Sequence, residues 1–243
     1  MTMKLMKAGL ILTLAMLIVS ACGMIPTYGS HTIISENRSV SGFDRLELSG
    51  AGGVTIIQDG TEALSVETDD NVMQDVTSKV LGGTLSIGLD VPSMRSVIPS
   101  RLSLILHVKD LSGLSTSGSW KVMAASFKAA NLDIATSGSG KVTIQNLTAD
   151  KLTVDISGSG QMDLAGLVNS QEVIISGSGI YQAGDLQAQH TQIKVSGSGN
   201  VTIWTNGDLQ ADLSGMGTIR YYGSPKVTYN ESGVGSIKSL GNK

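Results

Sequence analysis

The sequence is short of cysteine, aromatic residues, proline and charge. One cysteine in 243 residues excludes a disulfide framework and a cluster of thiolate metal ligands. Charged residues make up only 15% and form no basic stripe, which argues against nucleic acid as a partner. With 4 prolines against 30 glycines and 4% aromatic residues, the composition is aliphatic, rich in glycine and serine, and typical of β-structure.

The single cysteine stands at the end of an N-terminal leader. Lys4 and Lys7 precede an apolar run over residues 8–19, which has the length of a signal-peptide core. This run is too short to cross roughly 30 Å of hydrocarbon, which needs about 20 residues. It ends in Val19-Ser20-Ala21-Cys22, which resembles the lipobox of bacterial lipoproteins. That resemblance implies cleavage before Cys22 and a lipid, palmitate-type acyl chains included, on this cysteine.

The leader sets the expected location of the protein. We expect residues 1–21 to be a lipoprotein signal peptide and residues 22–38 to be the lipidated cysteine and a tether. The membrane is then a partner through the lipid anchor, and the protein lies in the cell envelope. Gly23 stands where an aspartate would mark inner-membrane retention in enteric-type lipoproteins, so a Gram-negative host predicts the outer membrane.

The C-terminal half of the sequence carries an internal repeat. Copies of Ser-Gly-x-Gly, or close variants, begin 18 to 20 residues apart at Ser117, Ser137, Ser157, Ser176, Ser196, Ser214 and Ser232. The first copy has Trp120 in place of the second glycine, and an isolated earlier copy begins at Ser49.

Aliphatic residues keep the same phase around these copies, which a flexible linker would not do. Five residues after each serine stand Val122, Val142, Met162, Tyr181, Val201, Ile219 and Ile237. Leucines recur ten residues after three of the serines, at Leu147, Leu167 and Leu186.

Each unit therefore predicts a strand, a glycine-rich corner, a second strand and a second corner. Two strands cannot bury their inner face alone, so the units must stack. Antiparallel hairpins would reverse every second unit, whereas the constant phase favours parallel coils with like residues about 4.8 Å apart. The sequence predicts an all-β parallel β-helix with coils of about 20 residues over residues 111–240. A β-sandwich or barrel of the same strands is the alternative.

Residues 39–110 alternate less regularly and form the expected β-rich part at the N-terminal end. Strands are predicted at residues 43–48, 54–57, 63–68, 84–89 and 102–108, and a helical turn over residues 70–80. We expect this part to cap the open end of the coils, because an unpaired strand edge invites aggregation.

An ordered series of motifs resembles the head GIN domain family of auto-transporter adhesins. The series comprises Ser41–Leu48 (SGFDRLEL), Val54–Ile56, Leu64–Glu67, Gly83–Ile87 and the Ser-Gly-Ser-Gly copies. The resemblance covers about residues 39–240 and implies a right-handed parallel β-helix in a bacterial envelope protein, often a lipoprotein. The family offers no catalytic residues to carry over.

The residues themselves predict no catalytic site, no metal site and no cofactor. A polysaccharide lyase or hydrolase would gather carboxylates on adjacent coils. The candidate acids are scattered in the repeat, at Asp133, Asp155, Asp163, Asp185, Asp208 and Asp212. The three histidines, His31, His107 and His190, show no ligand spacing. We predict that the protein is not an enzyme, and a polysaccharide-acting β-helix enzyme is the alternative.

Two aromatic residues are candidates for contact with a ligand. Tyr181 and Tyr221 fall at inward positions of the repeat, whereas Trp204 and Tyr222 are out of that phase and are expected to face solvent. Exposed aromatic rings can stack on sugars or anchor a protein partner.

The sequence as a whole predicts a lipid-anchored β-helix that presents a surface for binding, adhesion or scaffolding. The expected partner is a glycan or a protein of the envelope or host surface, and a homo-oligomer is left open. A structural or stress-related envelope component is the other alternative.

Overall fold

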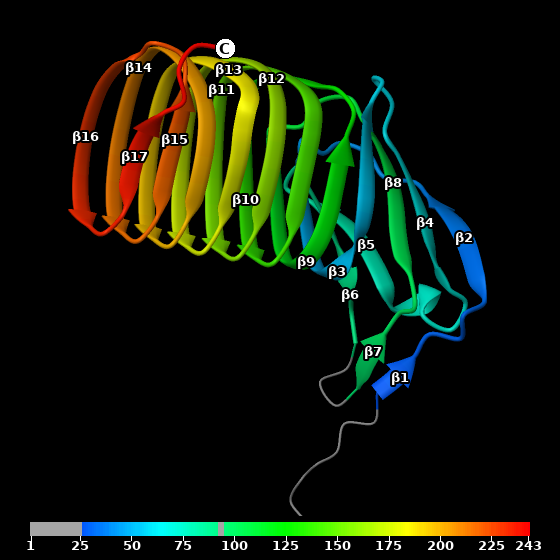
Figure 1. Cartoon of the computed structure of the whole chain (residues 1–243). Helices are drawn as coiled ribbons and strands as arrows, with labels where there is room; N and C mark the ends of the chain where they lie inside the picture. Colours follow the sequence, from blue (N-terminus) through cyan, green and yellow to red (C-terminus); the bar gives the residue numbers. More distant parts are fainter. Residues whose placement is uncertain (1–25, 92–94) are drawn as a thin grey trace, which may run out of the picture.

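The repeat folds into stacked coils of β-structure (Figure 1). The computed structural model describes residues 26–91 and 95–243. Four central coils are each one long curved strand: β11 (Lys141–Gly158), β12 (Gln161–Gly177), β13 (Ile180–Gly197) and β14 (Asn200–Gly215). Shorter strands lie on either side of them: β9 (Gly113–Ala124), β10 (Phe127–Gly138), β15 (Thr218–Tyr222), β16 (Lys226–Gly233) and β17 (Ser236–Ser239).

Neighbouring coils pair in parallel with like residues opposite each other. Ser137 lies opposite both Ser117 and Ser157, and the same serine ladder continues to Ser232. This register confirms the predicted β-helix. The β-sandwich or barrel is wrong, because the coils form one continuous parallel ladder instead of two packed sheets or a closed sheet.

The two glycines of each Ser-Gly-x-Gly copy have different roles. The first glycine takes a left-handed backbone conformation, with φ between 104° at Gly118 and 129° at Gly233, which bends the chain at the corner. The second glycine is buried against the preceding coils. A Cβ atom on Gly160 would lie 2.8 Å from Thr136 Cγ2, so a side chain there would collide with the core.

The second corner is a bend within a strand, where the sequence predicted a break. The ladder between β11 and β12 continues through it with a register shift between Ile144 and Leu147. Such a bulge bends a strand without ending its pairing. The coil of β12 is one residue shorter, so Gly166 lies opposite Leu147 while Leu167 is 52% exposed. The predicted leucine ladder is therefore wrong at Leu167.

Inward side chains fill the coils with one continuous apolar core. The predicted inward series is buried at Val122, Val142, Met162, Tyr181, Val201 and Ile219. Polar groups within this core are paired: Tyr181 Oη donates to Gln171 Oε1 at 2.8 Å, and Gln171 Nε2 donates to Thr191 Oγ1 at 3.1 Å. Burial raises the pKa of Tyr181, so its hydroxyl stays protonated in this network.

The N-terminal part begins with the first coil. Strand β3 (Arg45–Gln58) joins two predicted strands and pairs in parallel with β9, so Ser49 lies opposite Ser117. The sheet continues from β3 through β8 (Leu102–Val108), β4 (Ala63–Asp69) and β2 (Ile33–Arg38), and β4 is antiparallel to both of its neighbours. A hairpin of β5 (Val76–Leu81) and β6 (Thr84–Leu89) pairs with β3 through β6. These strands cover the N-terminal end of the coils (Figure 1).

Two predictions for this part need correction. The helical turn predicted over residues 70–80 is a single 3-10 turn, η1 (Met73–Asp75), because the chain enters β5 at Val76. Residues 33–38 of the predicted tether form β2 and pair with β4, and β1 (Pro26–Tyr28) pairs with β7 (Ser96–Ile98). No helix of the described residues is long and apolar enough to cross a membrane. Cys22 and the leader lie outside the described residues.

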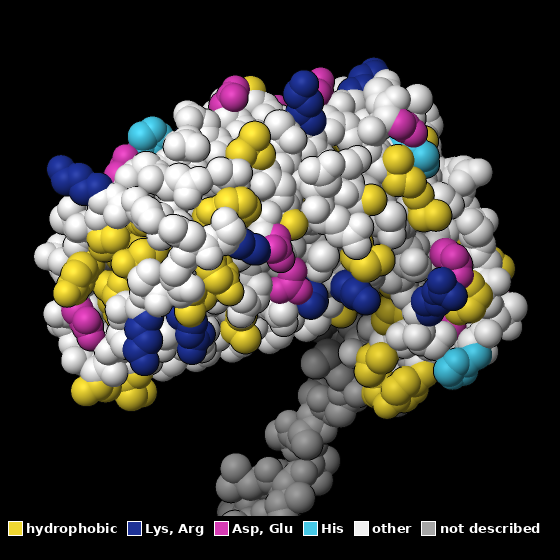
Figure 2. Space-filling model, turned by 45° about the horizontal axis from the view of Figure 1, so that its top comes forward, with side chains coloured by type: hydrophobic (Ala, Val, Ile, Leu, Met, Phe, Trp, Pro, Cys, Tyr) yellow, Lys and Arg dark blue, Asp and Glu magenta, His cyan; other side chains and the backbone are white. Residues whose placement is uncertain are grey.

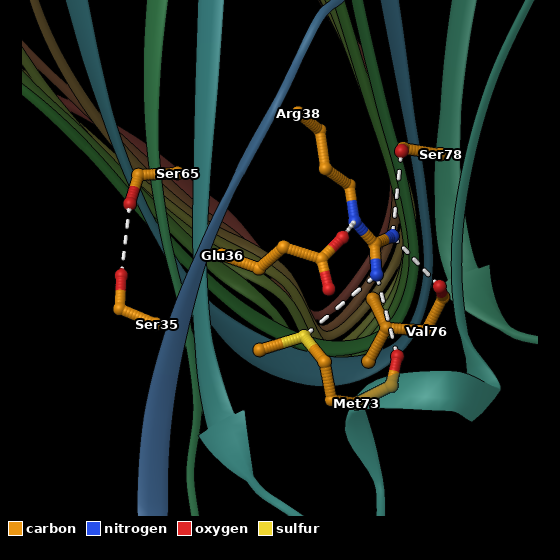
Figure 3. A network of polar contacts seen from close by, with 7 residues as sticks. All are labelled: Ser35, Glu36, Arg38, Ser65, Met73, Val76 and Ser78. Carbon is orange, nitrogen blue, oxygen red and sulfur yellow. Dashed lines mark hydrogen bonds and ion pairs between the residues drawn. The ribbon is translucent and has the colours of Figure 1, made fainter.

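Arg38 joins β2 to the β5–β6 hairpin (Figure 3). Its Nη1 donates to the carbonyl of Val76 at 2.7 Å, its Nη2 donates to the carbonyl of Met73 at 3.3 Å, and its Nε donates to Glu36 Oε1 at 2.9 Å. Ser35 and Ser65 face each other across β2 and β4 with their hydroxyl oxygens 3.3 Å apart. The planar guanidinium therefore holds the edge of the N-terminal cap in place.

Candidate binding site

Polar side chains form a ladder on the outer side of the coils. Thr143, Asp163, Gln182 and Thr202 lie opposite one another on successive strands. They point outward because each stands between buried residues, as Thr202 does between Val201 and Ile203. The β-helix thus places hydroxyl, carboxylate and amide groups at regular intervals along one line.

This ladder lines a groove of about 500 Å³. Backbone and side chains of the second bend add to its wall, and Tyr222 and Lys243 close one end. The groove is lined by Thr143, Gln145, Asp163, Gln182, Gly184, Asp185, Thr202, Tyr222 and Lys243, among others. Asp163 lies near one of its ends with its carboxylate 2.5 Å from Lys141 Nζ and 3.0 Å from Gln161 Nε2.

Trp204 and Tyr222 lie next to each other at the C-terminal end of this groove. They are ladder partners on β14 and β15, and both side chains are half-buried on the outer side of the coils. Tyr222 lines the groove directly. Its ring packs over Gly184, where a Cβ atom would lie 3.3 Å from Tyr222 Cε2. The absence of a side chain at Gly184 lets the ring approach the backbone.

Lys243 reaches these two rings from the C-terminal segment. Its Nζ lies 5.6 Å from the centre of the Trp204 ring and 5.2 Å from that of Tyr222, within the range of cation–π attraction. The same ammonium donates to the carbonyl of Gly184 at 2.7 Å and forms an ion pair with Asp185. Motif spacing could not predict this contact, because Lys243 lies outside the repeat.

The candidate acids pair with separate neighbours. Asp208 lies 2.5 Å from His190 Nδ1, and Asp212 accepts a hydrogen bond from Asn230 at 2.9 Å. Asp155 lies opposite Ala135 and Ile174 in the ladder, which carry no acid or base. These carboxylates are therefore distributed over the surface, and Figure 2 shows charged side chains of both signs scattered over one face of the molecule.

The histidines are also separate. His107 Nδ1 lies 2.6 Å from Asp59 Oδ2, and hydrogen bonds from Thr61 and His107 lower the pKa of Asp59 to about 2. His31 lies in the N-terminal segment with a left-handed backbone, φ 64°. Within residues 26–91 and 95–243, no three His, Cys, Asp or Glu side chains are close enough to hold a metal ion together.

A second hollow, of about 350 Å³, lies where the hairpin meets the outer face of the first coils. Its walls carry Glu47 and Ser86, whose side chains are hydrogen-bonded at 3.1 Å, and the exposed Asp155. Exposed serines of the corner ladder, Ser117, Ser137 and Ser157, form its floor. Sequence reasoning missed this hollow, because it depends on how the β5–β6 hairpin packs.

Solved structures with the same fold come from species of Bacteroides and Parabacteroides. A putative adhesin from Bacteroides fragilis is 26% identical, with a TM-score of 0.82, and the alignment covers 88% of this chain and all of that one. Two proteins from Parabacteroides distasonis, described as a putative lipid binding protein and a putative adhesin, are 24% and 22% identical with TM-scores of 0.73 and 0.70. Each of these two alignments covers 89% of this chain and all of the other. No curated protein matches the chain.

A family model matches most of the described fold. The match spans residues 42–225, from the loop before β3 to the residue before β16. It therefore includes the strands of the N-terminal cap from β3 onward, the corner glycines up to Gly215 and the ladder that carries the groove. The chain belongs to the family described as "Putative auto-transporter adhesin, head GIN domain".

Proposed function

We propose that this protein is a non-enzymatic envelope lipoprotein that binds a glycan in the groove between Thr143 and Tyr222. The observation that carries the proposal is a groove in which hydroxyl, amide and carboxylate groups line a rigid floor and an aromatic ring stands at one end. Sugars offer hydroxyl groups to such polar side chains and an apolar ring face to an aromatic one. The family description, that of an adhesin, agrees with a binding role at the cell surface or envelope.

The distribution of acids supports binding over catalysis. Glycoside hydrolysis uses two carboxyl groups flanking one bond, about 5 to 9.5 Å apart, one of them held protonated. Here Asp163 is held by Lys141 and Asp185 by Lys243, so both carboxylates that line the groove are paired with cations. Each carboxylate is thus engaged by an ammonium group of the chain itself, and no second, unengaged carboxylate of the described residues lines the groove beside it.

The proposal includes a lipid anchor at Cys22 and, for a Gram-negative host, the outer membrane. It rests on the leader and lipobox of the sequence. We expect Cys22→Ala to abolish incorporation of a fatty-acid analogue and to release the protein from the membrane fraction. Unchanged labelling and membrane association in this variant would contradict the anchor.

A binding screen tests the function. Residues 24–243, which contain every strand of the described fold, are applied to a glycan array and to envelope extracts. We expect a saturable glycan signal that falls at least ten-fold in a Trp204→Ala, Tyr222→Ala double variant, as expected for aromatic anchors. Thr228→Ala on β16 is the matched control and keeps full binding, because Thr228 does not line the groove.

The other outcomes separate the alternatives. Cleavage of an arrayed polysaccharide would show a polysaccharide-acting enzyme and contradict the proposal. Absence of any binding by folded protein would also contradict it and would favour a structural envelope component. If a protein from the extract binds and this binding is lost in the double variant, the groove is still the binding site. Its ligand is then an envelope or host-surface protein and not a glycan.

A further inference from the structure

An ammonium group occupies a built site at the end of the groove. The site consists of two aromatic rings, Trp204 and Tyr222, the carbonyl of Gly184 and the carboxylate of Asp185. Lys243 Nζ makes contact with all four. An ammonium has three donors and one positive charge, so a carbonyl, a carboxylate and ring faces satisfy it together.

A bulge in β13 creates this site. Ala183 lies opposite Ile203 and Gln187 lies opposite Trp204, so residues 184–186 have no ladder partners on β14. A bulge leaves backbone groups unpaired and redirects side chains. Leu186 remains buried in the core while Asp185 is exposed. The bulge therefore frees the carbonyl of Gly184 and turns the carboxylate of Asp185 outward, beside the two rings.

The position of Lys243 is that of an internal ligand. Its side chain comes from beyond the last strand, β17, and lies in the groove without being part of the ladder. The contacts that hold it are those that would hold an ammonium group of another molecule. An intramolecular group of this kind competes with a free ligand at an effective concentration on the order of millimolar.

We propose that this site binds the alkylammonium group of a ligand and that Lys243 is its intramolecular competitor. The site forms the Tyr222 end of the proposed binding groove and specifies which group of the ligand binds there. Its biological role therefore rests on the proposed function. The ligand is one that carries an ammonium group beside hydroxyls, since the polar ladder adjoins the site through Asp185 and Thr202. Amino sugars and lipid headgroups share this chemistry.

The test replaces Lys243 and measures binding of simple cations to residues 24–243. Methylammonium and n-butylammonium are titrated, and the fluorescence of Trp204 reports occupancy, since the other tryptophan, Trp120, is buried in the core. We expect Lys243→Ala to bind both cations at least ten-fold more tightly than the unchanged chain. Lys226→Ala removes the same charge from exposed β16 and leaves the affinity as in the unchanged chain.

Two further variants test whether Asp185 and the two aromatic rings hold the cation. In the Lys243→Ala background, Asp185→Asn should weaken cation binding at least five-fold, and Trp204→Leu, Tyr222→Leu should abolish it as measured by calorimetry. The neutral counterpart of n-butylammonium, 1-butanol, should not bind. Equal binding of 1-butanol, or equal cation affinity with and without Lys243, overturns the inference.

Separate probes identify the source of the ammonium group. Glucosamine oligomers bound by Lys243→Ala indicate an amino sugar. Vesicles that contain phosphatidylethanolamine, bound in preference to vesicles of phosphatidylglycerol alone, indicate a lipid headgroup. If the site binds cations but the protein binds no glycan or envelope component, the ammonium site is supported and the proposed function is contradicted. If the protein binds a glycan but shows no preference for cations, the proposed function is supported and the ammonium site is contradicted.

Discussion

Asp69 joins three segments of the N-terminal part through one buried carboxylate. It accepts hydrogen bonds from the backbone of His31 at 2.8 Å, and from the backbone and hydroxyl of Ser100 at 2.8 and 2.6 Å. Burial alone would raise the pKa of Asp69, but these donors outweigh it and lower the pKa to about 2. A Cβ atom on Gly29 would overlap the carboxylate, so the chain needs glycine there.

We predict that Asp69→Asn lowers the free energy of unfolding by about 2 to 3 kcal/mol at pH 7, because an amide cannot serve all of these donors. Since the pKa of the folded state lies below its ordinary value of 3.8, the stabilisation by the carboxylate is present above about pH 4. It is lost as the pH falls from about 4 through 2. Urea denaturation of both proteins at pH 7, 4 and 2.5 measures the difference.

The exposed Asp155 is the matched control for Asp69. Asp155→Asn should change the free energy of unfolding by less than about 0.5 kcal/mol at every pH, as surface substitutions usually do. A difference between the unchanged protein and Asp69→Asn that stays constant from pH 7 to 2.5 would show that the carboxylate charge is not what stabilises this region.

We also predict that a side chain at a corner glycine destabilises the fold. Gly158 has φ 112°, and a Cβ atom on it would lie 2.8 Å from the carbonyl oxygen of Gly138 on the preceding coil. Gly158→Ala should therefore destabilise the protein by about 1 to 3 kcal/mol in thermal or urea unfolding. Its exposed neighbour supplies the comparison: Ser159→Ala should have almost no effect. Equal stability of the two variants would contradict the assigned role of the corner.

At the scale of elements, the last coil is an open edge with a charge turned toward the core. Glu231 on β16 lies opposite Leu213 and so takes an inward position. No coil among the described residues covers it, and its side chain is exposed. An inward-pointing charge on an edge strand opposes pairing with another chain. Glu231 thus protects the end of the coils that the N-terminal part does not cover.

Glu231→Val should remove this protection. We expect the variant to associate end to end as its concentration rises from micromolar to hundreds of micromolar, while the unchanged protein does not gain mass. Sedimentation velocity measures the change. Thr228→Val adds the same side chain to the outer face of β16 and should leave the mass unchanged. Association of both variants, or of neither, would show that the inward charge does not decide the behaviour of this edge.

The repeat made most of the fold predictable because parallel stacking forces one phase on every coil. The constant distance from the serine of each Ser-Gly-x-Gly copy was enough to predict that Val142, Met162 and Val201 face the core. The phase also placed Trp204 and Tyr222 outside, where the structure has them half-buried. The constant spacing failed where a coil loses one residue, as at Leu167.

The rest of the site depends on irregularities that motif spacing does not show. Residues 184–186 are extra on β13, and a second register shift between Ala188 and His190 puts one extra residue on β14, so the coil from Ser176 takes 20 residues and the coil from Ser196 takes 18. The spacing shows this net difference of two residues but not where the bulge lies. Lys243 reaches the site from outside the repeat. The sequence analysis also missed strand β2 and the single 3-10 turn at Met73, because long-range pairing overrides local preference there.

In the whole molecule, the constant register means that one complete coil can be deleted without changing which residues of the other coils face each other. Deletion of residues 141–160 joins Gly140 to Gln161, which lies opposite Lys141 in the ladder, so every inward position keeps its phase. We expect this variant to fold with the same circular dichroism per residue and a lower melting temperature, because one neighbour interface is lost.

Deletion of half a coil is the control. Removal of residues 141–150 joins Gly140 to Lys151, which belongs to the other side of the coil, and should give an unfolded or aggregated chain. A folded half-coil variant, or an unfolded whole-coil variant, would contradict a stability that depends on stacked register.

Mapping where a ligand binds shows directly whether the groove is the binding surface. Hydrogen–deuterium exchange of residues 24–243 is measured with and without a saturating ligand from the glycan or envelope screen. We expect slower exchange at residues 143–145, 163–165 and 182–185 and at Thr202 and Tyr222, which surround the groove. Protection confined to the serine corners or to the N-terminal strands β2, β4 and β8, with the groove unchanged, would show that the groove is not the binding surface.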